Sequence, residues 1–210
     1  STLTNAAPHV GSRVVVNLDL SDFFPTIDFA RVAGLLRGVG YSPAVATILS
    51  LLCTESPRRV IRNRDRVIYA ATGNRSLPQG ACTSPMLSNL ISVRMDKRLA
   101  GTAKSIGWTY TRYADDMTFS TKSDVGKVGY LLARVHHVTR EEGFQIHPEK
   151  TRVLRQNTRQ AVTGSVGNDR PSIDRKMIRK LRAILHNARR EGLAKQNRAG
   201  MWFFQLWSVG

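Results

Sequence analysis

The chain has 210 residues, 41% of them hydrophobic, and carries 32 Lys and Arg against 15 Asp and Glu, a formal net charge of +17. The hydrophobic fraction excludes disorder throughout, and this positive excess is typical of folded proteins that bind a polyanion. No apolar run is long enough to span a bilayer, and the Cys and His residues lack zinc-like spacing, so we expect a cytoplasmic protein with reduced thiols.

The first predicted element is a buried strand over residues 13–20, because its β-branched and aliphatic residues form a continuous run. Asp19 stands near the end of this strand, where a buried carboxylate without a partner is costly. It is either a cap for the following segment, for which Ser21-Asp22 is a fair helix start, or a metal ligand aimed out of the end of the sheet.

Helical spacing of apolar residues predicts a helix over residues 29–39 and another over 44–53, opened by Pro43. Residues 55–76 are basic and polar. Within them, Val67-Ile68-Tyr69 is a candidate short strand.

Residues 77–85, Leu-Pro-Gln-Gly-Ala-Cys-Thr-Ser-Pro, predict a shaped loop because Pro and Gly interrupt regular structure. An amphipathic helix is predicted to follow over residues 86–99. A loop of this kind at a helix N-terminus can hold phosphate or a nucleotide, and an ordinary loop with Pro at the helix start is the alternative.

Two adjacent carboxylates, Asp115 and Asp116, lie between the β-prone runs 108–113 and 117–120, which predicts a hairpin with the acids at its turn. Most such pairs are solvated turn residues. Because neighbouring carboxylates repel, a pair held at a hairpin tip can instead bind a divalent metal.

A helix is predicted over residues 125–142, a short strand over 144–146, and a further pair of strands over 152–154 and 160–166. The order of these elements predicts an α+β fold, with an antiparallel sheet covered by helices on one face.

Residues 171–198 read as a strongly basic helix pair, whose apolar stripe is expected to pack and whose other face is charged. Ten cations against two acids favour contact with a phosphate backbone over a merely solvated face. The cations are Arg170, Arg175, Lys176, Arg179, Lys180, Arg182, Arg189, Arg190, Lys195 and Arg198. The apolar residues 201–207 are expected to pack on this helix or on a piece of the protein outside this sequence, and base stacking by their aromatic rings is the alternative.

Asp19, Asp115 and Asp116 fit one mechanism if the fold joins them. Phosphoryl transfer needs positioning and charge neutralisation, which two Mg²⁺ ions held by carboxylates can supply. Mg²⁺ prefers oxygen ligands, so three Asp residues without His or Cys suit it, with Mn²⁺ as a substitute.

These residues resemble the motifs of reverse transcriptases. Thr111 to Asp116 resembles the catalytic hairpin, Asn17 to Ile27 the first palm motif, Leu77 to Leu90 the template and nucleotide loop, and Gly143 to Thr151 the motif after it. Residues 162–168 resemble the primer grip. Cys82 departs from the loop pattern, where Pro is frequent, and is expected to alter loop stiffness only.

Two further marks resemble bacterial retron reverse transcriptases. Asn5-Ala-Ala-Pro-His9 matches their Asn-Ala-x-x-His signature, and Val162-Thr163-Gly164 matches their Val-Thr-Gly triplet. The resemblance implies a polymerase palm over residues 1–168, with part of the fingers inserted at about 30–76, and the start of a helical thumb over 169–210. The remaining fingers and thumb are expected outside this sequence, which we therefore expect to be a piece of a longer chain.

The resemblance also implies roles, residue by residue. Asp19, Asp115 and Asp116, with Leu20, are the implied metal site, and Lys150 is a candidate acid for the pyrophosphate leaving group or else a surface lysine. Phe24 corresponds to the aromatic gate that excludes a ribose 2′-OH, or is a core residue. The implied nucleotide-binding residues are Leu20, Asp22, Phe23, Phe24, Gln79 and Gly80.

The implied function is RNA-directed DNA synthesis of retron type, in which a structured noncoding RNA is copied from deoxynucleoside triphosphates into a branched, RNA-linked single-stranded DNA in antiphage defence. An effector protein is a further expected partner. The alternatives are a group II intron or other defence-associated reverse transcriptase, and a non-catalytic RNA-binding palm module. The two retron marks argue against the intron enzyme, and the intact Asp triad argues against a binding module.

Overall fold

The computed structural model describes residues 2–63, 66–123, 127–155, 161–162, 165–166, 172–173 and 175–192. Its strands are β1 (Val14–Ser21), β2 (Arg58–Asn63), β3 (Arg66–Ala71), β4 (Thr109–Tyr113), β5 (Asp116–Thr121), β6 (Gln145–Ile146), β7 (Arg152–Arg155), β8 (Ala161–Val162), β9 (Ser165–Val166) and β10 (Ser172–Ile173). Its helices are α1 (Thr2–Ala6), the 3-10 helix η1 (Ala7–His9), α2 (Phe23–Thr26), α3 (Phe29–Gly38), α4 (Pro43–Cys53), α5 (Ser84–Ser105), α6 (Val128–Glu141) and α7 (Arg175–Glu191).

Strand β1 is the centre of the main sheet. Strand β5 pairs along one edge of β1, antiparallel, and carries β4 on its far side. Strands β6 and β7 share the other edge, β6 at the C-terminal end of β1 and β7 at its N-terminal end, both antiparallel. The predicted α+β fold with an antiparallel sheet is therefore confirmed.

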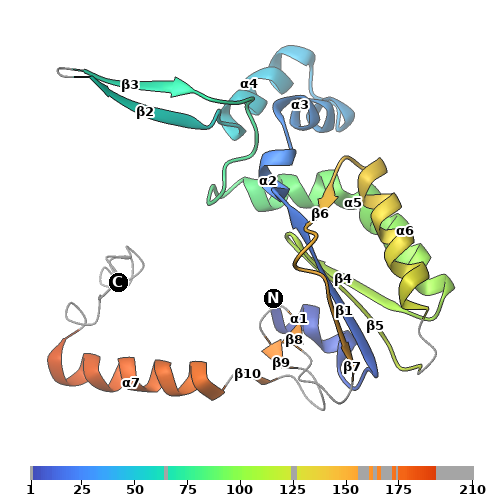
Figure 1. The fold of residues 1–210 in the computed structure, drawn as a ribbon. Coiled ribbons are helices and arrows are strands. Elements are labelled where there is room, and N and C mark those ends of the chain that lie inside the picture. Colours follow the sequence, from blue (N-terminus) through green and yellow to red (C-terminus); the bar gives the residue numbers. More distant parts are fainter. Residues whose placement is uncertain are drawn as a thin grey trace.

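Side-chain alternation along β1 explains its burial. Val16, Leu18 and Leu20 join the main hydrophobic core, and Val15 faces the other way, where it packs with Ala6 and Leu154. Helices α5 and α6 lie side by side against the sheet (Figure 1) and contribute Met95, Leu99, Leu131 and Val135 to that core. Helix α1 contacts the sheet through β4.

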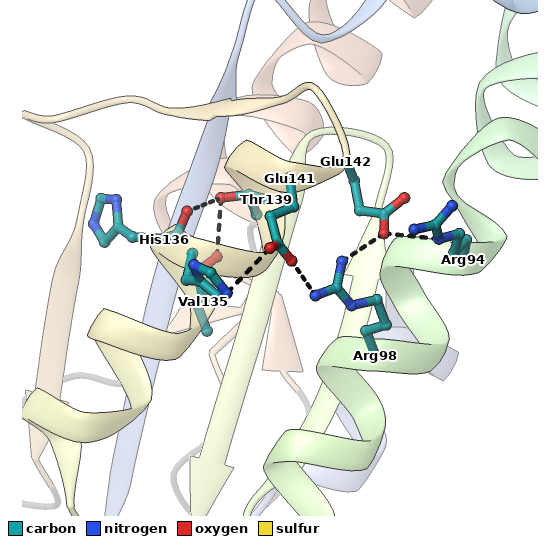
Figure 2. Close-up of polar contacts among 8 residues, drawn as sticks. Arg94, Arg98, Val135, His136, Thr139, Glu141 and Glu142 are labelled. Atoms are coloured by element: carbon teal, nitrogen blue, oxygen red, sulfur yellow. Dashed lines mark hydrogen bonds and ion pairs between the residues drawn. The ribbon is translucent and has the colours of Figure 1, made fainter.

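An ion-pair cluster joins α5 to the end of α6 (Figure 2). The Glu142 carboxylate lies 3.1 Å from Arg94 Nε and 2.7 Å from Arg98 Nη1, and Arg98 also pairs with Glu141. Only 11% of the Glu142 side chain is exposed, so this carboxylate requires its cationic partners. The cluster fixes the packing of the two helices that support the sheet.

The backbone segment from α3 to β3 begins and ends at one place beside the main sheet. Leu77 N donates to Ile27 O at 3.0 Å, and Ser76 forms bridges with both Asp28 and Glu55. Beyond this crossing, the β2–β3 hairpin extends away from α3 and α4 (Figure 1).

Most predicted elements are confirmed within two or three residues: β1, the β4–β5 hairpin, α3, α4 and β6. Helix α5 extends to Ser105, beyond the predicted end at residue 99. Helix α6 begins at Val128, and residues 125–126 at its predicted start lie outside the described residues.

Four predictions need correction. The strand over residues 13–20 is not the first element, because residues 2–9 are helical, and Ala6 is buried. The basic region contains a full hairpin, β2–β3, where only a short strand was predicted. The hairpin was missed because its strands place Arg and aliphatic residues on both exposed faces, so the sequence does not alternate between polar and apolar residues. Strand β7 pairs with β1, and β8 and β9 pair with each other, so 152–154 and 160–166 are not a strand pair.

The fourth correction concerns the basic C-terminal region. Ile173 belongs to β10, which pairs with β9, and the single helix described there, α7, begins at Arg175. Leu181 and Leu185 keep 56% and 54% of their surface exposed, while Ile178 and Ile184 are partly buried, so the described part of the apolar stripe is only partly covered. Residues 193–210, including the aromatic segment 201–207, lie outside the described part of the chain. Among the described residues, we find no helix of the length and apolarity required to cross a membrane.

Candidate active site

The sheet brings Asp19 and Asp116 together. They are direct partners in the antiparallel register of β1 and β5, so their side chains leave the same face of the sheet. The next pair on this face is also polar, since Thr118 Oγ1 donates to Asn17 Oδ1 at 3.2 Å. Leu18 and Met117, which alternate with these residues, belong to the core.

Asp115 lies in the two-residue turn between β4 and β5. Ala114, the other turn residue, has φ +53°, a left-handed conformation that is costly for a residue with a Cβ. The turn is tied to β1 because Leu20 N donates to Asp115 O at 3.0 Å. On the other side of β1, His147 N donates to Asp19 O at 2.7 Å, which brings the β6–β7 connection to the same place.

Lys150 joins the three acids from this connection. Its Nζ lies 2.9 Å from Asp19 Oδ1, and the hydrogen bond and charge of Asp19 raise the pKa of the lysine. The pKa of Asp116 is also raised, chiefly by burial, then by the charges of Asp115 and Asp19, while Lys150 opposes the shift. Three carboxylates that repel one another and one ammonium group therefore share the site.

The acids are not arranged as a coordination shell. Among the residues that the structure describes, no group of three or more His, Cys, Asp or Glu side chains could hold a metal ion as placed. Asp19 pairs with Lys150 instead, which offsets part of the repulsion among the carboxylates.

The segment after β1 carries the predicted nucleotide-binding residues. Asp22, at φ +45°, precedes α2 without capping it through its side chain, and with Ala114 it is one of two non-glycine residues at positive φ in the described chain. Phe23 is buried, and Phe24 is half-buried with its ring centroid 5.3 Å from that of Phe23. Backbone strain of this kind clusters at functional sites.

The loop before α5 is held at its ends and open in its middle. Leu77 is buried, and Ser84 Oγ donates to Pro78 O at 2.7 Å. Gln79 and Gly80 between them are exposed, and Gly80 has φ +92°, which favours glycine.

The residues of the two sequence marks that resemble retron enzymes lie in different parts of the fold. His9 is buried under the sheet, with Nδ1 2.7 Å from Ser120 Oγ and Nε2 2.7 Å from Thr111 Oγ1. The carbonyl of Asn5 accepts from Thr111 Oγ1 at 3.4 Å. Val162 lies in β8, and Thr163 and Gly164 lie outside the described residues.

Helix α7 presents the predicted nucleic-acid-binding cations. Five of them are exposed: Arg179, Lys180, Arg182, Arg189 and Arg190. Arg175 is the first residue of the helix.

Two residues beneath the hairpin were missed in the sequence. Arg112 donates from Nε and Nη2 to the two carboxylate oxygens of Asp96 on α5, at 2.8 and 2.7 Å. Alternation along β4 could have placed Arg112 on the helix-covered face, opposite Thr111. No local signal identifies Asp96 as its partner, because the contact depends on how α5 packs.

Comparison with known proteins agrees with this geometry. Residues 1–187 match the family described as Reverse transcriptase (RNA-dependent DNA polymerase). The chain is 47% identical to the Retron Mx162 reverse transcriptase of Myxococcus xanthus (97% of this chain, 46% of the relative) and 34% identical to the Retron Ec86 reverse transcriptase of Escherichia coli (89% and 53%). It therefore spans about half the length of these curated relatives.

The fold is also similar to that of solved telomerase structures. Telomerase from Candida tropicalis, in complex with a fragment of telomeric RNA, aligns with a TM-score of 0.57 at 10% identity, over 82% of this chain and 31% of the other. At this identity the likeness concerns the fold alone.

Proposed function

Because the chain belongs to the reverse transcriptase (RNA-dependent DNA polymerase) family, we propose that it carries the palm active site of an RNA-directed DNA polymerase of retron type. The observation that carries the proposal is the register pairing of Asp19 with Asp116, with Asp115 in the adjoining turn. We assign residues 1–168 to the palm, with the fingers portion inserted at about 30–76, and residues from 169 onward to the start of the thumb.

Asp19, Asp115 and Asp116 would hold divalent metal, with the Leu20 main chain beside them. The donor set fits a hard cation, since it offers carboxylate oxygens, and the pKa of Asp116 is raised by burial and then by the charges of Asp115 and Asp19. Two bound Mg²⁺ ions would supply Lewis-acid activation of the attacking hydroxyl and charge neutralisation at the leaving group. The chain's own contribution is the rigid placement of the carboxylates on β1 and the hairpin.

The segment from Asp22 to Phe24 would bind the incoming deoxynucleotide. Backbone N–H groups of Asp22 and Phe23 would donate to the triphosphate, and the Phe24 ring would clash with a ribose 2′-OH. Gln79 and Gly80, exposed in the loop before α5, would line the nucleotide and template pocket. Lys150, held beside Asp19, would donate a proton to the pyrophosphate leaving group.

Template and primer would lie along basic surfaces, including the exposed cations of α7. Given the similarity to retron reverse transcriptases, we further propose a structured noncoding RNA as template and primer, a branched RNA-linked DNA as product, and a role in antiphage defence with an effector protein.

Primer extension by the intact protein tests the polymerase assignment. Asp115→Asn and Asp116→Asn should each abolish deoxynucleotide incorporation in Mg²⁺. Glu149→Gln is the matched control, because it removes an exposed acid next to Lys150 and should retain activity. Undiminished synthesis by both Asp variants would refute the assignment of the metal site.

A further inference from the structure

The catalytic turn is supported from below by a buried arginine. Arg112 exposes only 5% of its side chain and forms a two-pronged ion pair with Asp96, through Nε at 2.8 Å and Nη2 at 2.7 Å. Tyr110 O–H donates to the same carboxylate at 2.8 Å. Asp96 therefore fixes the plane of the guanidinium group, because each prong restricts its rotation.

The remaining nitrogen of Arg112 reaches the turn itself. Its Nη1 donates to Ala114 O at 2.7 Å, and Ala114 has the left-handed φ of +53°. A strained residue keeps its conformation only when the surroundings determine it. Here the determinants are Arg112, which holds the carbonyl before Asp115, and Leu20 N, which holds the carbonyl of Asp115 at 3.0 Å.

The same guanidinium group also contacts the proposed nucleotide-binding segment. Its Cζ lies 5.5 Å from the centroid of the Phe23 ring, within the range of a cation–π contact. Phe23 in turn lies 5.3 Å from Phe24 and 5.5 Å from Phe144, centroid to centroid. One side chain thus touches both the turn with Asp115 and the ring adjoining Phe24.

We propose that Arg112, oriented by Asp96, is a positioning residue that sets the catalytic turn against the nucleotide-gate segment. This inference rests on the proposed polymerase function. Lysine cannot replace Arg112, because a single ammonium group cannot span both Asp96 oxygens and the Ala114 carbonyl in one plane.

The test uses the intact protein with Arg112→Lys, Arg112→Met and Asp96→Asn. Arg98→Met is the matched control, because Arg98 also forms ion pairs on α5 but contacts Glu141 and Glu142. In steady-state primer extension, kcat should fall by about 10- to 100-fold in both Arg112 variants, since small displacements of reacting groups have effects of this size. Asp96→Asn should show a smaller fall, and Arg98→Met should stay within about twofold of wild type.

Hydrogen exchange supplies a readout that does not depend on activity. The Leu20 amide, bonded to Asp115 O, should exchange faster in the Arg112 variants than in Arg98→Met, while core amides such as Val16 stay protected. Wild-type kcat together with unchanged Leu20 exchange in folded Arg112→Lys would overturn the proposal. An inactive wild type would refute the polymerase function instead, and hydrogen exchange would still decide whether Arg112 holds the turn.

Discussion

The buried histidine under the sheet should make the stability of the protein depend on pH. His9 is 1% exposed, and its burial lowers the pKa from 6.5 to about 4. Thr111 donates to the Asn5 carbonyl, so its oxygen accepts from Nε2 of a neutral imidazole, and Ser120 donates to Nδ1. The folded state thus holds His9 uncharged.

The direction of the pH dependence follows from proton uptake by His9 in the folded and unfolded states. Below pH 6.5 the unfolded chain protonates His9, and the folded protein does not until about pH 4. The free energy of unfolding therefore falls with decreasing pH across this window, by about 2 kcal/mol between pH 7 and pH 5 and by about 3 kcal/mol at most.

Urea denaturation of the intact protein at pH 7 and pH 5 measures this effect, with His9→Gln as the comparison. Glutamine keeps a polar group at the site but cannot titrate, so the contributions of all other groups cancel in the difference between the two proteins. Wild type should lose about 2 kcal/mol more than His9→Gln over this interval. A difference below about 0.5 kcal/mol would refute the buried, neutral state of His9.

Three further predictions concern the gate, the helix junction and the basic helix. Phe24→Val should raise ribonucleotide incorporation relative to deoxynucleotide by at least about tenfold in single-nucleotide extension, and an unchanged ratio would exclude Phe24 as the gate. Glu142→Gln should lower the free energy of unfolding by about 2 kcal/mol in urea, more than Glu141→Gln, whose carboxylate is 45% exposed; equal losses would contradict the ion-pair cluster. Replacing Arg189 and Arg190 together by Gln should reduce the salt dependence of RNA binding, as the slope of log K against log salt, by about 2. An unchanged slope, or the same change in a Lys104→Gln control, would show that these residues of α7 do not contact RNA.

Local patterns predicted the elements that carry the proposed chemistry. The β-branched run of β1 and the paired β-prone runs around Asp115 each reflect contacts within or between adjacent segments, so their positions follow from nearby sequence. The grouping of Asp19 with Asp115 and Asp116 was inferred from their chemistry, and the register of β1 with β5 supplies the geometry.

Long-range packing could not be predicted in the same way. The edge on which β7 pairs with β1 depends on residues more than 130 positions apart, and no local pattern selects it. Asp96 was missed for a related reason, since an acid within an amphipathic helix usually indicates a solvated face, and only the packing of α5 under β4 gives it Arg112 and Tyr110 as partners.

The inserted segment begins and ends at one place in the backbone, between Ile27 and Leu77, and its first helix, α3, also packs into the main core through Val32. Because the chain enters and leaves the palm through adjacent backbone bonds, changing the length of the segment between them adds little loop-closure entropy and leaves the register of β1 untouched. Arg75 stabilises this junction, since its guanidinium group donates to the carbonyls of Leu51 and Thr54 at the end of α4. Chimeras that exchange this segment should keep the main sheet intact if they retain Arg31 and Val32, because Arg31 donates to Glu142 O at 3.0 Å and Val32 lies in the main core.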